Sequence, residues 1–156
     1  MREHTVAALF LLLASAAPAQ TVPSGWKLIR DAKAACQIAV PPEWSAFSEA
    51  GGSAIFHDPS TGIAVVTNQP GQAFKPLTPA MLKMLGVPKE KIFENSATRL
   101  FYQDKTSEGA DDTHAFTASA PGNGGTCSCR VVFLPSISLE TARKIVLSLG
   151  PVPPTE

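Results

Sequence analysis

The segment Asn123–Phe133, NGGTCSCRVVF, joins a glycine-rich turn to a stretch in which residues of two kinds alternate. In a β-strand, side chains two positions apart point to the same face of the sheet. Cys127 and Cys129 therefore share the face of Phe133, and this face is more apolar than the opposite one. The alternation predicts a strand over Cys127–Leu134, with both thiols directed toward an apolar core.

The chain contains three cysteines, Cys36, Cys127 and Cys129, so three pairings are open. Cβ atoms two positions apart in an extended strand are roughly 6.5–7 Å apart, whereas a disulfide needs roughly 3.5–4.5 Å. A Cys127–Cys129 bridge would therefore require a kinked strand. A bridge from Cys36 to either partner closes a loop of about 90 residues, which the chain-entropy model values at about 4–5 kcal/mol. We expect a structural disulfide between Cys36 and one of the other two cysteines, with the remaining thiol buried.

Further strands are predicted where short apolar segments are bounded by turn residues. The segment DPSTG at Asp58–Gly62 supplies Asp, Pro and Gly for a turn, so the strands on either side of it should form a hairpin. The predicted strands are Cys36–Val40, Ser53–His57, Ile63–Asn68, Lys91–Ala97, Thr98–Lys105, Thr113–Ala120 and Cys127–Leu134.

Two helices are predicted from their terminal residues. Thr78 and Pro79 begin a short middle helix that ends at Gly86, because these residue types favour helix starts and ends respectively. A longer C-terminal helix begins after Ser138 and ends at Gly150. Its apolar side chains fall on one stripe at helical spacing, namely Leu139, Ala142, Ile145, Val146 and Leu149. The predicted fold class is therefore α+β, with an antiparallel β-sheet of about six or seven strands packed by both helices.

Residues 1–19 have the pattern of a secretory signal peptide. Arg2 precedes an apolar run, Val6–Ala17, that is too short to span a bilayer as a helix, which needs roughly 20 residues. Ala17-Pro18-Ala19 then provides a site with small residues on either side of the proline, and we expect cleavage after Ala19. The mature chain is thereby predicted to be secreted or periplasmic, without stable insertion into a membrane.

Residues 20–156 are predicted to form a single α+β domain with short flexible tails at 20–25 and 150–156. The chain has 13 basic and 13 acidic residues, and removing Arg2 and Glu3 with the signal leaves it neutral. A neutral chain lacks the basic surface that drives binding to nucleic acid or to anionic membranes. We therefore expect an unknown protein or small-molecule partner, and no nucleic acid.

Three segments of the chain resemble the PsbP-like superfamily of small extracytoplasmic α+β proteins. They are IAVPPEW at Ile38–Trp44, the turn DPSTG at Asp58–Gly62, and ARKIVLSLG at Ala142–Gly150. The resemblance extends roughly from Cys36 to Gly150. It implies an antiparallel sheet between helices, and an accessory or binding role, since no common catalytic residue marks the group. It assigns no functional residue to this chain.

The motifs of common catalytic sites are absent from the sequence, which has no Gly-x-Ser-x-Gly, no His-Glu-x-x-His, no phosphate loop and no dinucleotide fingerprint. The segment GNGG at Gly122–Gly125 precedes a strand instead of a helix, and is therefore interpreted as a loop. His57 and His114 would need a carboxylate to form a metal site, and two unrelated, partly buried histidines are the favoured interpretation. Trp44 follows a Pro-Pro corner and is interpreted as a packing residue.

The sequence thus favours a non-enzymatic binding or accessory protein, with no catalytic residue, metal ligand or cofactor assigned. A thiol redox protein that uses Cys127 and Cys129 is the first alternative. A redox thiol usually lies at a helix N-terminus that lowers its pKa, and no helix is predicted there. A periplasmic metal-binding protein is the second alternative, since two thiolates suit a soft metal, but such a site needs more ligands.

Overall fold

The computed structural model describes residues 20–50, 53–58, 62–104 and 114–154, with only the backbone of 46–50 and 53–58. Its strands are β1 (Lys27–Arg30), β2 (Cys36–Val40), β3 (Ser45–Ala50), β4 (Ser53–Asp58), β5 (Gly62–Pro70), β6 (Ile92–Asn95), β7 (Leu100–Asp104), β8 (His114–Gly122), β9 (Gly125–Phe133) and β10 (Gly150–Pro151). The helices are α1 (Pro79–Leu85), α2 (Leu139–Leu147) and the short 3-10 helix η1 (Lys89–Lys91).

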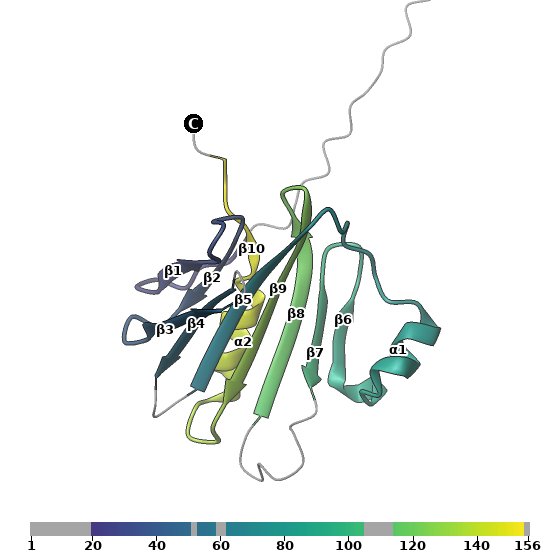
Figure 1. Cartoon of the computed structure of the whole chain (residues 1–156). Helices are drawn as coiled ribbons and strands as arrows, with labels where there is room; N and C mark the ends of the chain where they lie inside the picture. Colours follow the sequence, from purple (N-terminus) through teal and green to yellow (C-terminus); the bar gives the residue numbers. More distant parts are fainter. Residues whose placement is uncertain (1–19, 51–52, 59–61, 105–113, 155–156) are drawn as a thin grey trace, which may run out of the picture.

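Within the described ranges, the strands form two antiparallel sheets. The large sheet has the order β3-β4-β5-β9-β8-β7-β6, and the small sheet has the order β1-β2-β10 (Figure 1). The predicted α+β class is confirmed, but the prediction of a single sheet is wrong. The reason lies in β2, which is buried along its whole length and pairs with β1 and β10 instead of with a strand of the large sheet.

The strand predicted from the alternation at 127–134 is β9, and it lies at the centre of the large sheet. It pairs with β5 on one side and with β8 on the other, so that Cys129 lies opposite both Val66 and Ala118. Cys127, Cys129, Val131 and Phe133 are all at most 1% exposed, as the shared apolar face predicts. The strands of the predicted hairpin, β4 and β5, also pair antiparallel, although residues 59–61 of the turn lie outside the described residues.

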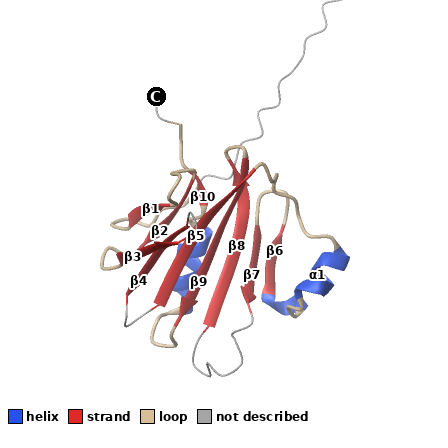
Figure 2. Ribbon diagram, viewed as in Figure 1, coloured by secondary structure: helices blue, strands red, loops and turns tan. Residues whose placement is uncertain are grey.

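Helix α2 covers the apolar face of β9. Ser138 caps its N-terminus by accepting a hydrogen bond from the Thr141 N–H at 3.1 Å. Three residues of the predicted stripe that lie within the helix are fully buried, namely Ala142, Ile145 and Val146, and the helix contacts β8, β9 and β2 (Figure 2). Leu139 was predicted on the same stripe but is 55% exposed, because the helix meets the sheet only after its first turn.

Helix α1 belongs to a second, smaller apolar cluster. Thr78 caps it by accepting a hydrogen bond from the Met81 N–H at 3.3 Å, and Gly86 ends it at a φ of 67°, in the left-handed region that glycine favours. The cluster is built from Val87, Leu100 and Tyr102, with Phe74, Leu77, Leu85 and Ile92 packed against it. Leu100 and Tyr102 flank Phe101 in β7, and Phe101 belongs to the main core. Since neighbouring side chains of a strand point to opposite faces, this cluster lies on the opposite face of the sheet from α2.

Residues 150–152 are paired with the small sheet, whereas the sequence predicts a tail at 150–156. Gly150 and Pro151 form β10, whose Cα atoms lie opposite Gln37 and Cys36 of β2. The Val152 N–H then donates to the Ala35 carbonyl at 2.9 Å. Proline has no N–H to donate and is therefore suited to an edge strand such as β10. Residues 150–152 therefore belong to the small sheet.

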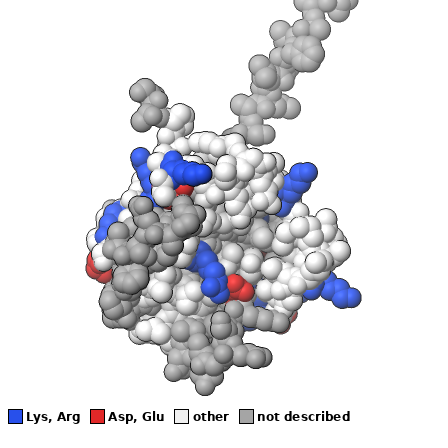
Figure 3. All heavy atoms as spheres, in the orientation of Figure 1, with Lys and Arg blue, Asp and Glu red and all other residues white. Residues whose placement is uncertain are grey.

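The described part of the chain shows no helix that is both long enough and apolar enough to cross a membrane. Residues 1–19, on which the signal-peptide prediction rests, lie outside the described residues. On the face that Figure 3 shows, the Lys and Arg side chains lie at separate places instead of in one basic patch. This distribution agrees with the neutral charge of the chain.

Candidate functional site: a pocket beside the disulfide

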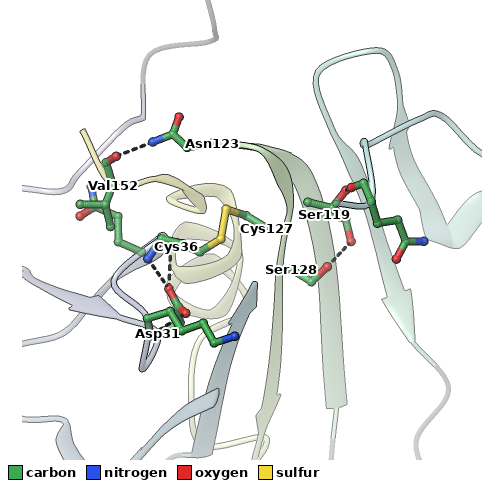
Figure 4. Close-up of a disulfide and its surroundings, with 12 residues drawn as sticks. Asp31, Cys36, Ser119, Asn123, Cys127, Ser128 and Val152 are labelled. Carbon is green, nitrogen blue, oxygen red and sulfur yellow. Dashed lines mark hydrogen bonds between the residues drawn. A yellow bond between two sulfur atoms is a disulfide. The ribbon is translucent and has the colours of Figure 1, made fainter. Parts of the chain in front are cut away.

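A disulfide joins the small sheet to the large one. It links Cys36 in β2 to Cys127 in β9, across a sequence separation of 91 residues and a Cα–Cα distance of 5.6 Å (Figure 4). Both cysteines are fully buried. This bond is one of the two pairings that the sequence favours, and it spans the interface between β2 and the central strand of the large sheet.

Cys129 is the free cysteine, and it is 1% exposed. Burial raises the pKa of its thiol far above the ordinary value, because the charged thiolate loses its hydration. The thiolate is the reactive form of cysteine, so burial keeps Cys129 inert. The redox hypothesis needs Cys127 and Cys129 as partners, whereas the structure joins Cys127 to Cys36 and leaves Cys129 protonated in the core.

The loop that leads into Cys36 is organised by Asp31. This residue is 3% exposed, and its carboxylate accepts hydrogen bonds from the backbone N–H groups of Lys33 at 3.0 Å, Ala35 at 2.8 Å and Cys36 at 2.7 Å. Figure 4 shows the carboxylate next to the disulfide. Asp31 therefore fixes the backbone from which the Cys36 side chain projects, and sequence analysis did not single it out.

A pocket of about 470 Å³ lies at the end of the molecule near the disulfide. Its walls come from four parts of the chain: Gln20 before β1, the turn between β6 and β7, the tip of the β8–β9 hairpin, and the segment that follows α2. Most of the lining is apolar, and it includes Ala97, Ala120, Pro121, Leu149, Pro151 and Pro153. We call this cavity the proline-walled pocket. Its volume lies within the range of about 300–1,000 Å³ that is usual for small-molecule clefts.

The disulfide holds two walls of the proline-walled pocket together. Cys127 lies directly opposite Ala120 in the β8–β9 pair, and Cys36 lies directly opposite Pro151 in the β2–β10 pair. Ala120 and Pro151 both line the pocket. Each half of the bridge is therefore one strand away from a lining residue, a distance of about 5 Å between Cα atoms. The bond fixes the position of one wall relative to the other.

The hairpin tip and the C-terminal segment are also joined by a hydrogen bond. The side-chain amide of Asn123 donates to the Val152 carbonyl at 2.8 Å, as drawn in Figure 4. Between β8 and β9, Gly124 takes a φ of 75°, which keeps the turn short. The interpretation of the GNGG segment as a loop is confirmed for Asn123 and Gly124, which form the turn, whereas Gly122 and Gly125 are the paired ends of β8 and β9.

Arg99 supplies the cationic group of the proline-walled pocket. Its side chain is 17% exposed, and its Nε is buried with no hydrogen-bond partner among the described residues. The nearest carboxylate oxygen, Oε2 of Glu94, lies 3.7 Å from Nη1, beyond hydrogen-bond distance. The other oxygen of Glu94, Oε1, accepts a hydrogen bond from the Ser96 hydroxyl at 2.8 Å. The guanidinium of Arg99 therefore retains donor capacity next to an apolar cavity.

The structure does not bring His57 and His114 together. The two residues lie in β4 and β8, which are three strand spacings apart in the large sheet, or about 14 Å. The His114 ring packs 5.5 Å from the ring of Phe133, while the side chain of His57 lies outside the described residues. No group of three metal-ligating side chains occurs among the side chains that the structure describes. Trp44, which the sequence analysis interprets as a packing residue, is fully buried in the main core.

Comparison with known proteins gives matches among solved structures alone. No family model matches the chain, and no curated protein is similar to it. Among solved structures, a crystal structure of a protein from Bacteroides thetaiotaomicron VPI-5482 is similar, with a TM-score of 0.52 and 18% sequence identity over 80% of this chain. The chain spans about half the length of that protein, namely 48%. The similarity concerns the fold alone and assigns no ligand or activity.

Proposed function

We propose that the protein is a non-enzymatic, extracytoplasmic binding or accessory module that takes a small and mostly apolar ligand into the proline-walled pocket. The proposal includes removal of residues 1–19 by cleavage after Ala19, and a secreted or periplasmic location, where disulfides persist. We also propose that the chain is a PsbP-like protein, on the strength of the three segments that resemble that superfamily.

One observation carries this proposal: the residues opposite the two half-cystines, Ala120 and Pro151, both line the pocket. A cross-link placed there holds the walls at a fixed separation before any ligand arrives. A preformed cavity reduces the ordering cost of binding, which favours affinity. Apolar walls with few polar groups are typical of small-molecule sites.

The proposal is tested with N-phenyl-1-naphthylamine, a neutral aromatic probe whose fluorescence rises in apolar surroundings. We expect saturable binding to the chain from Gln20 onward. Ala97 is an exposed residue of the pocket wall, so Ala97→Trp should fill the cavity and abolish binding. Ala80→Trp is the matched control, because Ala80 is exposed on α1 and does not line the pocket.

Each outcome of this titration is decisive once circular dichroism shows that both variants are folded. Loss of binding in Ala97→Trp, with retention in Ala80→Trp, supports the proposal. Absence of saturable binding to the unmodified chain overturns it. Equal binding by both variants also overturns it, because the probe would then occupy some other surface.

A further inference from the structure

We infer that the ligand of the proline-walled pocket is an amphipathic organic anion, whose single carboxylate or similar acidic group pairs with Arg99. This inference rests on the proposed function and adds the chemical class of the ligand. Its apolar body would contact the apolar walls, among them Pro121 and Leu149.

The first step of the argument is the unsatisfied donor of Arg99. A guanidinium carries five N–H groups and stays charged at any physiological pH. The buried Nε lacks a partner among the described residues, and a buried charged donor without a partner is energetically costly. Because Arg99 lines the pocket and 17% of its side-chain surface is exposed, an anionic group in the cavity would pair with the exposed part of the guanidinium and lower the cost of its buried charge.

The second step is that the other polar side chains of the pocket, those of Gln20, Thr98 and Asn123, already form hydrogen bonds within the protein. The Thr98 hydroxyl lies 3.1 Å from that of Ser96. Gln20 donates to the Ser148 carbonyl and accepts a hydrogen bond from the Gln37 side chain at 2.8 Å. The amide nitrogen of Asn123 donates to the Val152 carbonyl at 2.8 Å. Arg99 is therefore the group that offers a charge-assisted bond, and such bonds are stronger than neutral ones.

The third step concerns the internal competitor, Glu94. Its Oε2 lies 3.7 Å from Nη1 of Arg99, so it neutralises part of the charge without satisfying the donors. Its side chain is 34% exposed, twice the exposure of the arginine, so solvent weakens this pair. A ligand carboxylate inside the pocket would approach the guanidinium from the cavity side and form the planar, bidentate contact that arginine favours.

The size of the cavity limits the ligand. A water molecule takes about 30 Å³ of the liquid, so the pocket of about 470 Å³ has room for on the order of fifteen waters. A ligand of comparable volume has one acidic group and a short chain or one to two rings. A bare inorganic anion would leave the apolar walls in contact with water.

The test compares two probes that differ by one sulfonate group, which carries a negative charge. 1-Anilinonaphthalene-8-sulfonate is N-phenyl-1-naphthylamine with one added sulfonate. We expect the sulfonate to bind the unmodified chain at least tenfold more tightly than the neutral probe. Arg99→Gln should lower the affinity for the sulfonate at least tenfold, while the affinity for the neutral probe changes less than twofold.

Matched variants separate the position of the charge from the total charge. Arg30→Gln removes an exposed arginine of β1 that does not line the pocket, and should leave both affinities unchanged. Arg99→Lys should restore part of the preference for the sulfonate, since it keeps the charge and loses the bidentate fork. Glu94→Gln should raise the affinity for the sulfonate severalfold, because the competing carboxylate is gone.

A competition arm defines the ligand class. Decanoate should displace the bound sulfonate at concentrations at which decanol and inorganic phosphate do not. Displacement by phosphate alone would overturn the inference in favour of a small inorganic anion. Equal affinity of the two probes for the unmodified chain would overturn the inference and leave the proposed function standing, whereas binding of neither probe would overturn both.

Discussion

The carboxylate of Asp31 determines how the chain enters β2. It accepts three backbone hydrogen bonds within five residues, the last of them from the half-cystine Cys36. Between these donors, Ala34 takes a φ of 52°, in the left-handed region that residues with a Cβ rarely adopt. The loop thus holds a strained residue in place with one buried acceptor.

Replacing Asp31 with Ala should lower the free energy of unfolding by about 2–4 kcal/mol, because three backbone N–H groups, among them the buried one of Cys36, lose a charged acceptor. Asp31→Asn should cost less, since it keeps one acceptor oxygen. Urea unfolding at neutral pH measures both variants. If Asp31→Ala and Asp31→Asn lose equal amounts of unfolding free energy, the charge of Asp31 stabilises the fold and its hydrogen bonds do not. No loss in either variant would contradict the role given to Asp31.

Cys129 makes stability depend on pH in the alkaline range. Burial raises the pKa of its thiol in the folded protein above the value of about 8.5 for a solvated cysteine. Below that pH the thiol is protonated in both states. Above it the unfolded chain releases the proton and the folded chain does not, so the unfolded state gains stability as the pH rises.

We therefore expect the free energy of unfolding to fall between about pH 8.5 and about pH 10, with a slope that cannot exceed about 1.4 kcal/mol per pH unit for one proton. Cys129→Ala should lack this part of the slope. The range ends at about pH 10 to limit the contribution of Tyr102 to the slope. The pKa of Tyr102 is also raised in the folded protein, chiefly by burial. Chemical denaturation at several pH values gives both curves, and parallel curves for the two proteins would refute the assignment.

At the scale of elements, the sequence identifies the strands and helices that carry their own local pattern. The alternation around Cys127 predicted β9, and the capping residues Thr78 and Ser138 predicted the two helices. These signals depend on residues a few positions apart, so they can be recognised in the sequence before the three-dimensional structure is known.

Sequence analysis missed β1 and β3, which pair with the strands that directly follow them, and β10, which depends on a partner far along the chain. β10 has two residues, too few to show any periodicity, and it exists because β2 presents an unpaired edge. The proline-walled pocket was missed for the same reason. Arg99 and Pro151 come together only after the hairpins and the small sheet have formed, and no spacing in the sequence relates them.

At the scale of the whole molecule, the Cys36–Cys127 disulfide joins two sheets that share no backbone pairing in the described ranges. Loss of a cross-link over this separation costs about 4–5 kcal/mol in the chain-entropy model. The free energy of unfolding of a small domain is about 5–15 kcal/mol, so a change of this size is readily measured.

We expect the double variant Cys36→Ala, Cys127→Ala to lose about 4–5 kcal/mol of unfolding free energy. Its small sheet should exchange backbone amide hydrogens faster than its large sheet. Cys129→Ala is the control, because it removes a buried thiol and keeps the bridge. Guanidinium unfolding and hydrogen exchange measure these effects. A double variant as stable as the control would show that the bridge does not stabilise the fold.

The placement of β2 also has a consequence for the order in which the chain matures. Cys36 is made early, but Cys127 follows 91 residues later, and the β10 partner of β2 comes later still. Until almost all of the chain has been synthesised, Cys36 therefore has no disulfide partner, and β2 has no strand to pair with on its β10 side. Cys129 follows Cys127 by only two residues. If oxidation precedes sheet formation, Cys36 can therefore form a disulfide with either thiol. The folded arrangement resolves that choice, because it places the Cα atom of Cys127 5.6 Å from that of Cys36 and leaves Cys129 as a buried free cysteine.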